Sequence, residues 1–147
     1  HFQELAASDS VGWLLRGGIS IGQLFIDDAM VWGEALLKSY YLEDKIANYP
    51  RIIIEKKVVN EIKQDSQLCE FIRKDFDNLY FLNFLNDCYF CGQMLMNGFK
   101  KMQKEVGKGI DEKTYQKFCW HMNFVNSELD RKNDKKDRKY RLSMDLE

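Results

Sequence analysis

The sequence predicts an α+β fold, in which a sheet carries helices packed on one face. Short apolar strands alternate along the chain with segments whose apolar residues recur at helical spacing, which is the pattern of a layered domain. The 147 residues are 45% hydrophobic and 31% charged, which is enough apolar material for one domain with its own core. The run of β-branched residues between Arg51 and Glu55 gives the clearest single strand.

The first half of the chain predicts a helix end, two strands joined by a turn, and a longer helix. Gly17, Gly18 and Gly22 lie inside the first strand, where glycine indicates close approach by another backbone or a ligand. The elements expected are, in order, a helix end at 2–10, a strand from Trp13 through RGGISIGQLF, a turn at 27–28, a strand at 30–32 and a helix at 33–47.

The second half predicts mainly helices around two strands. Asn78 suits a turn position with positive φ, and Asp111 suits the N-cap of the last helix. The elements expected are a strand at 51–55, a short helix at 56–63, a further candidate helix at 68–73, a turn at 75–78, a strand at 79–85, and helices at 88–106 and 112–129. We therefore predict one domain over residues 1–129, followed by a charged, flexible tail at 130–147.

The balance of charge narrows the range of partners. The net charge of -1 gives no electrostatic basis for binding nucleic acid or an acidic membrane. No apolar run reaches the length needed to cross a bilayer. The four cysteines, Cys69, Cys88, Cys91 and Cys119, are expected to be reduced thiols, which predicts a cytoplasmic protein.

Residues 16–43 carry an ordered pair of motifs. Arg16 to Gly22 reads RGGISIG, and Trp32-Gly33 opens a helix directly after a hairpin. This layout resembles the second half of class III adenylyl and guanylyl cyclases, where a glycine-containing strand, a hairpin and a helix with the motif D-x-W-G-x-x-V-N-x-A-x-R follow one another. The resemblance implies a partial ferredoxin-like cyclase homology domain, with a sheet, helices on one face and extra C-terminal helices.

Further segments are similar to the bacterial cyclase-like proteins of the Pycsar antiphage systems. These segments are RGGISIG (16–22), WGEALLKSYYLE (32–43), YPRIII (49–54), KDFDNLYFLNFL (74–85) and YQKFCWHMNFVN (115–126). Their order and spacing carry the resemblance, which spans most of the chain up to about residue 129. It implies the C-terminal part of an enzyme that converts a nucleoside triphosphate into a 3′,5′-cyclic pyrimidine nucleotide, which signals to an effector.

The resemblance also implies a divalent cation, Mg²⁺ or Mn²⁺, because cyclase chemistry uses two carboxylates to hold two metal ions. In the family these carboxylates lie in the first half of the domain, upstream of the residues present here. Ser8-Asp9-Ser10 matches the second metal motif in its letters only, since it lies close to the RGGI strand on a predicted helix end. We therefore assign no metal ligand and no catalytic residue, and expect the 147-residue chain alone to be inactive.

The same resemblance places a nucleotide beside Met30, Trp32, Leu37, Tyr40 and Tyr41. The family's base-reading Asp, ribose-orienting Asn and phosphate-stabilising Arg fall on Met30, Leu37 and Tyr41. A tyrosine does not replace an arginine opposite a developing phosphoryl charge. Tyr40 matches the Pycsar-like pattern, where a bulky ring favours a smaller base. The alternative is that Leu37, Tyr40 and Tyr41 are core or interface residues.

Arg16 and Arg51 complete the candidate nucleotide-binding set, because each begins a predicted strand and matches the resemblance. One interpretation is contact with a phosphate or base. The other is an ion pair with a carboxylate such as Glu43 or Glu55.

Other polar motifs have simpler explanations. Cys88-Tyr-Phe-Cys91, with Cys119 and His121 farther on, has the residue types of a zinc site, but the bulky aromatic neighbours favour packed thiols and a hydrogen-bonded structural histidine. The pairs Asp27/Asp28 and Asp75/Asp77 are candidate metal carboxylates, yet each lies at a turn where Asp is expected anyway.

The aromatic content predicts a partner surface. Phe, Trp and Tyr make up 14% of the chain, more than a small core buries easily. Because class III cyclases form each active site between two subunits, we expect a homodimer with an NTP substrate and a cyclic-nucleotide effector system. The alternative function is a non-catalytic cyclase-like module for nucleotide binding or dimerisation.

Overall fold

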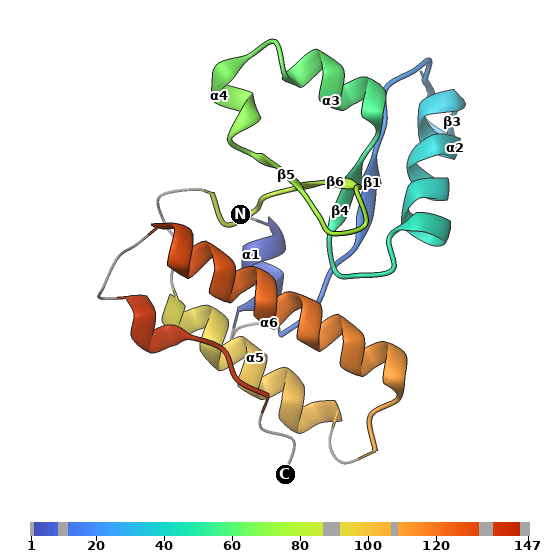
Figure 1. The fold of residues 1–147 in the computed structure, drawn as a ribbon. Helices are drawn as coiled ribbons and strands as arrows, with labels where there is room; N and C mark the ends of the chain where they lie inside the picture. The colour runs from blue at the N-terminus through green and yellow to red at the C-terminus, as the bar shows by residue number, and fades with distance from the viewer. Residues whose placement is uncertain (1, 9–11, 87–91, 107–108, 133–136, 145–147) are drawn as a thin grey trace. The chain divides into compact units, whose positions relative to one another are not determined.

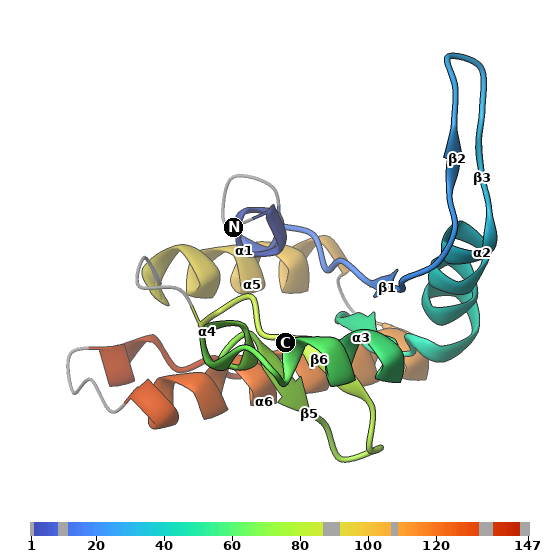
Figure 2. The same cartoon turned by 90° about the horizontal axis from the view of Figure 1, so that it is seen from above.

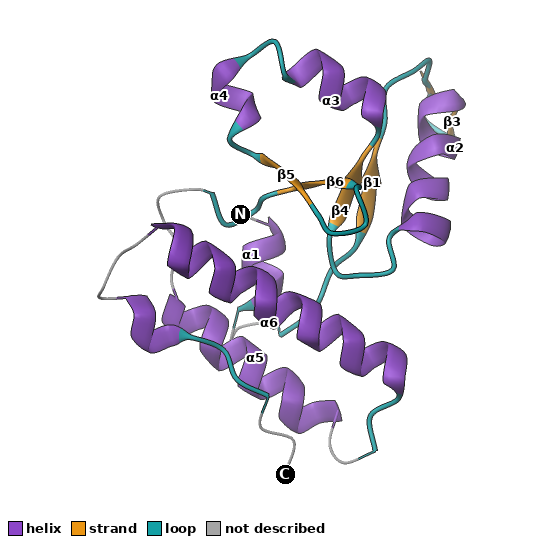
Figure 3. Ribbon diagram, viewed as in Figure 1, coloured by secondary structure: helices purple, strands orange, loops and turns teal. Residues whose placement is uncertain are grey.

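The computed structural model describes residues 2–8, 12–86, 92–106, 109–132 and 137–144 (Figure 1). Contacts divide the chain into two compact units. We call Arg16–Asn83 the sheet unit, and His1–Leu15 together with Phe84–Glu147 the helical unit. The secondary structure is mixed α+β, as the sequence predicts (Figure 3).

The sheet unit contains a four-stranded mixed sheet and a separate hairpin. The strand order of the sheet is β1-β4-β6-β5; β1 is parallel to β4, and the other neighbours are antiparallel. The elements of the unit are β1 (Gly17–Ile19), β2 (Phe25–Ile26), β3 (Val31–Trp32), α2 (Glu34–Tyr41), the π-helix η1 (Leu42–Ile46), β4 (Ile52–Ile54), α3 (Lys56–Ile62), α4 (Ser66–Cys69), β5 (Ile72–Lys74) and β6 (Tyr80–Leu82).

The core of the sheet unit lies around β4, as its β-branched sequence predicts. Ile53 and Ile54 are buried, and Ile53 pairs across the ladder with buried Phe81. The close-approach role expected for the glycines of the first strand is confirmed at Gly18, because a Cβ there would collide with the carbonyl oxygen of Ser39 on α2. The helix therefore packs directly onto β1.

The helical unit consists of α1 (Phe2–Ala7), α5 (Gly92–Val106), α6 (Glu112–Lys132) and the 3₁₀ helix η2 (Asp137–Tyr140). Leu95, Phe99 and Met102 on α5 are buried at spacings of four and three residues, as expected for one helix face. The Phe99 ring meets Phe118 of α6 edge-on, with centroids 5.5 Å apart. The predicted cap is confirmed, since Asp111 Oδ1 accepts the backbone N–H of Thr114 at 3.1 Å.

Several predicted boundaries are wrong. The candidate helix at 68–73 is only the end of α4, and Ile72–Lys74 forms β5 because Ile72 and Arg73 pair with Leu82 and Phe81. The strand expected from Trp13 through Phe25 is confined to β1 and β2, and the strand expected at 79–85 is β6 alone. The last helix continues past residue 129 into the predicted tail, as far as Lys132, and Leu142 is buried.

The predicted turn at Asn78 is confirmed, with φ at 65°.

Candidate functional site

The β2–β3 hairpin is a two-stranded arm with apolar residues on both faces. Phe25 and Trp32 are partners across the ladder, and their rings stack with centroids 4.7 Å apart. Ile26 pairs with Val31, and all four side chains are exposed. Figure 2 shows the hairpin extending away from the rest of the sheet unit. Neither face of this hairpin is covered by the part of the chain that the structure describes.

The predicted turn at the tip of the hairpin is confirmed. The Asp27 carboxylate accepts the backbone N–H groups of Ala29 and Met30 at 2.8 and 2.9 Å. These two hydrogen bonds lower the pKa of Asp27 below its usual value. Asp27 thus acts as a turn residue, which agrees with the simpler of the two interpretations of this pair.

Gly33 is the N-cap of helix α2, and its φ of 146° is accessible mainly to glycine. None of the residues from Glu34 to Tyr41 is buried. Leu37 is 70% exposed, and Tyr40 and Tyr41 are also exposed. The core interpretation of these three residues is therefore wrong, and the interface interpretation stays a prediction.

The loop before β2, the hairpin and α2 expose a set of large apolar side chains that we call the arm face, although within the hairpin these side chains point to both sides. Its members are the exposed large apolar residues between positions 21 and 41, namely Ile21, Leu24, Phe25, Ile26, Met30, Val31, Trp32, Leu36, Leu37, Tyr40 and Tyr41. Five of the seven candidate nucleotide-binding residues belong to it: Met30, Trp32, Leu37, Tyr40 and Tyr41. The structure thus brings most of the predicted site residues into two neighbouring elements.

A pocket of about 340 Å³ opens beside α2 within the sheet unit. Its polar groups compensate one another, because Lys38 Nζ lies 2.7 Å from Glu34 and 3.5 Å from Glu55. The hydrogen bond from Lys38 lowers the pKa of Glu34 and raises that of Lys38. The lining residues are Glu34, Leu37, Lys38, Tyr41, Leu42 and Glu55. The walls are mainly apolar, so this pocket suits an apolar group.

Arg16 forms the ion pair that one interpretation expects. Its Nε lies 2.6 Å from Glu43 of η1, and both side chains are partly exposed. The pair connects the residue before β1 to the π-helix that continues α2. An exposed pair of this kind contributes little to stability.

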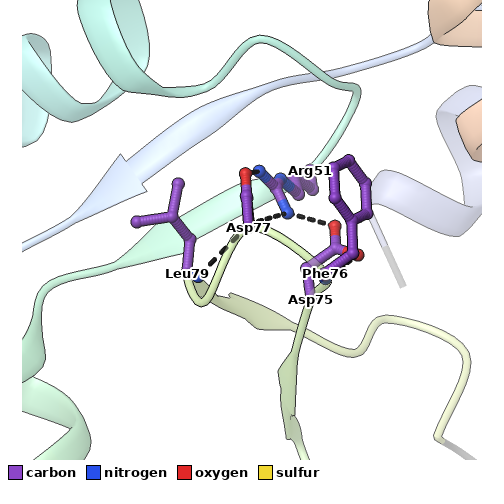
Figure 4. Close-up of polar contacts among 5 residues, drawn as sticks. All are labelled: Arg51, Asp75, Phe76, Asp77 and Leu79. Atoms are coloured by element: carbon purple, nitrogen blue, oxygen red, sulfur yellow. Dashed lines mark hydrogen bonds and ion pairs between the residues drawn. The ribbon is translucent and has the colours of Figure 1, made fainter.

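Arg51 also forms ion pairs, with partners different from those suggested by the sequence. Its side chain is 0% exposed and contacts the carboxylates of Asp75 and Asp77 in the turn before β6 (Figure 4). The guanidinium lies 5.3 Å from the centroid of the Tyr49 ring and 6.0 Å from that of Phe81. Arg51 therefore lies in a buried ion cluster rather than on the arm face.

The Asp75/Asp77 pair does not fit a divalent metal, because the buried Arg51 guanidinium already occupies both carboxylates. Burial opposes ionisation of Asp77, but hydrogen bonds from Arg51 and from the backbone N–H of Leu79 outweigh it and lower its pKa. Within the described residues, no three His, Cys, Asp or Glu side chains form a metal-binding group.

Of the remaining cysteine and histidine candidates, some lie within the described residues and others lie outside them. Cys88 and Cys91 lie outside the described residues, as do Asp9 and Ser10. Cys119 is a free, half-buried thiol. His121 is buried beside the rings of Phe99 and Phe84, with centroids 5.9 and 6.5 Å away, and burial lowers its pKa to about 4. The expectation of a hydrogen-bonded histidine is wrong for Nε2, which is buried and has no hydrogen-bond partner in the described structure.

Sequence reasoning missed two features of the sheet unit. It did not pair Arg51 with Asp75 and Asp77, because the two segments meet only through the sheet. It also missed a lysine cluster formed by Lys56 and Lys63, at the two ends of α3, together with Lys74 of β5. The sequence does indicate part of this cluster. In KKVVNEIK, Lys56 and Lys63 are seven residues apart, which places them on the same face of a helix.

The structure thus defines a mixed α+β protein with an exposed apolar hairpin and helix. No helix among the described residues combines the length and apolar character needed to cross a membrane. Compared with known proteins, the chain matches no protein-family model, no curated protein and no solved structure.

Proposed function

We propose that this chain is the C-terminal part of a class III cyclase-like domain of the Pycsar type, and that the arm face is its contact surface with a second copy. The observation that carries the proposal is the set of large apolar side chains exposed between residues 21 and 41. The succession of β1, the hairpin, α2 and a parallel β4 supports the ferredoxin-like cyclase assignment.

The size of the arm face supports a protein partner. Phe25, Trp32, Tyr40 and Tyr41 are each more than half exposed. An aromatic side chain has about 150–250 Å² to bury, so these four half-exposed rings alone offer on the order of 400 Å², and the aliphatic members of the arm face add to it. A standard interface buries about 800 Å² per partner. An isolated two-stranded hairpin is also only marginally stable, so a partner that covers it would stabilise it.

The charge of the arm face supports a second copy as that partner. Glu34 and Lys38 neutralise each other, and the aspartates at 27 and 28 lie at the tip of the hairpin. Residues 21–41 carry a net charge of -2, but both uncancelled aspartates are confined to the tip, so the apolar remainder, where Glu34 and Lys38 cancel, does not repel an identical surface across a two-fold axis. In this arrangement Arg16, Tyr40 and the pocket beside α2 form one side of a nucleotide site, and Mg²⁺ or Mn²⁺ comes with carboxylates outside this sequence.

A non-catalytic dimerisation or nucleotide-binding module is the second candidate function. The observation that favours it is the apolar character of the positions where cyclases carry polar groups. Met30, Leu37 and Tyr41 occupy those positions and are exposed. We expect the chain by itself to act as such a non-catalytic module.

The test is light scattering on the purified chain and on matched leucine variants. Leu37→Asp adds a charge to the arm face, whereas Leu68→Asp makes the same change at an exposed leucine of α4. We expect a dimer for the unaltered chain and for Leu68→Asp, and a monomer for Leu37→Asp. An unaltered chain that stays monomeric, or equal effects of the two variants, would refute the arm face as the contact.

Incubation with the four NTPs and Mn²⁺ then tests whether this chain is catalytic by itself. We expect the chain alone to form no cyclic product, because the family's metal carboxylates are outside it. Formation of a cyclic nucleotide would establish the enzyme and would show that the chain contains metal ligands not recognised here.

A further inference from the structure

A second pocket of the sheet unit, of about 310 Å³, is lined by side chains whose only charges are positive. It lies between α3 and the β5–β6 hairpin. Its lining residues are Lys56, Val59, Asn60, Lys63, Lys74, Asn78 and Tyr80, and no carboxylate occurs among them. We call it the α3–β6 pocket. None of its residues belongs to the arm face.

Local structure brings the lysines together. Lys56, Val59, Asn60 and Lys63 are spaced i, i+3, i+4 and i+7 on α3 and at its C-terminal end, so they share one helix face. Val59 is buried and fixes that face against the unit. From the other side, the ladder between β5 and β6 pairs Lys74 with Tyr80.

Tyr80 lies where the lysines converge. Its hydroxyl oxygen accepts a hydrogen bond from Lys63 Nζ at 3.2 Å, and the two ammonium groups of Lys63 and Lys74 lie 4.8 and 5.9 Å from the ring centroid. The hydrogen bond from Lys63, followed by its charge and those of Lys74 and Lys56, lowers the pKa of Tyr80. Among the described residues, none of the three lysines has a carboxylate within ion-pair distance.

We propose that the α3–β6 pocket binds the phosphate groups of a small, multiply charged phosphorylated molecule. Several lysine ammonium groups in one pocket suit a compact polyanion, because each supplies a point charge on a flexible stem. The Tyr80 hydroxyl accepts from Lys63 and can donate its own proton to a phosphate oxygen. The side-chain amides of Asn60 and Asn78 add donors at the rim. The volume is at the lower end for ligand pockets, which favours a small ligand.

Calorimetric titration of the full chain tests this proposal, with inorganic pyrophosphate and a nucleoside triphosphate as separate probes. We expect both to bind at low ionic strength and binding to weaken as salt is added. The double variant Lys63→Gln/Lys74→Gln should lose at least about tenfold in affinity, because two of three converging charges are gone. Lys57→Gln is the matched control, since Lys57 is on α3 but does not line the pocket. Its affinity should stay within about twofold.

Tyr80→Phe distinguishes a built site from general attraction to positive charge. It keeps the ring and all the lysines, so a loss of several-fold in affinity would show that the hydroxyl is part of the site, either by contacting the ligand or by positioning Lys63. Tighter binding of the nucleoside triphosphate than of inorganic tripolyphosphate, a further probe with the same number of phosphate groups, would identify a nucleotide as their source. Absence of binding by both probes, or an equal loss in Lys57→Gln, would overturn the proposal. Leu37→Asp should bind both probes normally, so failure of the dimer would leave this site intact.

Discussion

At the scale of single residues, burial separates two arginines that look alike in the sequence. Arg16 and Arg51 each precede a strand and each pair with carboxylates. Arg16 is partly exposed, so water competes with its ion pair. Arg51 is fully buried, so its charge depends on Asp75 and Asp77. The same residue type is therefore a surface contact in one place and a structural requirement in the other.

Replacing each arginine with methionine tests this difference. Arg51→Met leaves two carboxylates without their cation and should lower the free energy of unfolding by about 3–5 kcal/mol. Arg16→Met removes an exposed ion pair and should cost about 0–1 kcal/mol. Urea unfolding measures both values. Similar losses in the two variants would contradict the assigned role of the buried cluster.

His121 predicts a dependence of stability on pH. Its pKa is 6.5 as a free side chain and about 4 when buried in the helical unit. Between these values the unfolded chain binds more protons than the folded one, so stability falls as the pH drops from 6.5 towards 4. The full shift corresponds to about 3 kcal/mol.

The check is urea unfolding of the unaltered chain and of His121→Leu, at neutral pH and at about pH 5. Carboxylates contribute little in this interval. The unaltered chain should lose stability over it, whereas the variant should be nearly flat. An equal loss in both would assign the effect to other groups.

At the scale of elements, the close packing of α2 on β1 depends on glycine. A Cβ at Gly18 would collide with the Ser39 carbonyl, whereas one at Gly17 would lie 3.5 Å from the Ile52 side chain, an ordinary contact. The two glycines are neighbours in one strand, so a Cβ atom at one and a Cβ atom at the other would lie on opposite sides of the sheet. Only one of them faces the helix.

Alanine substitutions at these two positions form a matched pair. Gly18→Ala should lower the free energy of unfolding by about 1–3 kcal/mol, because backbone has to shift. Gly17→Ala should change it by less than about 1 kcal/mol. Chemical denaturation measures both, and equal effects would contradict the assigned packing of α2.

At the scale of the whole molecule, the chain contains two units, each with buried apolar residues of its own. The helical unit is built from segments at both ends of the sequence, and the sheet unit is continuous between them. The arm face, its pocket and the α3–β6 pocket all lie within the sheet unit. The two proposed binding functions therefore concern the same continuous segment.

The parts of the fold that the sequence predicted correctly depend on interactions between residues close together in the chain. Ile52–Ile54 forms a strand because β-branched residues favour extended backbone, and α6 begins where Asp111 caps it. Asn78 adopts positive φ because its short polar side chain tolerates that conformation. Sequence reasoning missed β5 because the residues at 68–73 have helical spacing. The strand conformation of β5 comes from its pairing with β6, which local spacing does not reveal.

By itself, the sequence determined the α+β class, the turns at Asp27 and Asn78, the helix after Gly33 and the concentration of candidate residues between positions 30 and 41. Only the tertiary structure decided that these residues are exposed, that Arg51 belongs to Asp75 and Asp77, and that lysines from α3 and β5 meet at Tyr80. The physical reason is that turns and helix starts arise from neighbouring residues. Burial and charge pairing arise instead from segments brought together by the sheet.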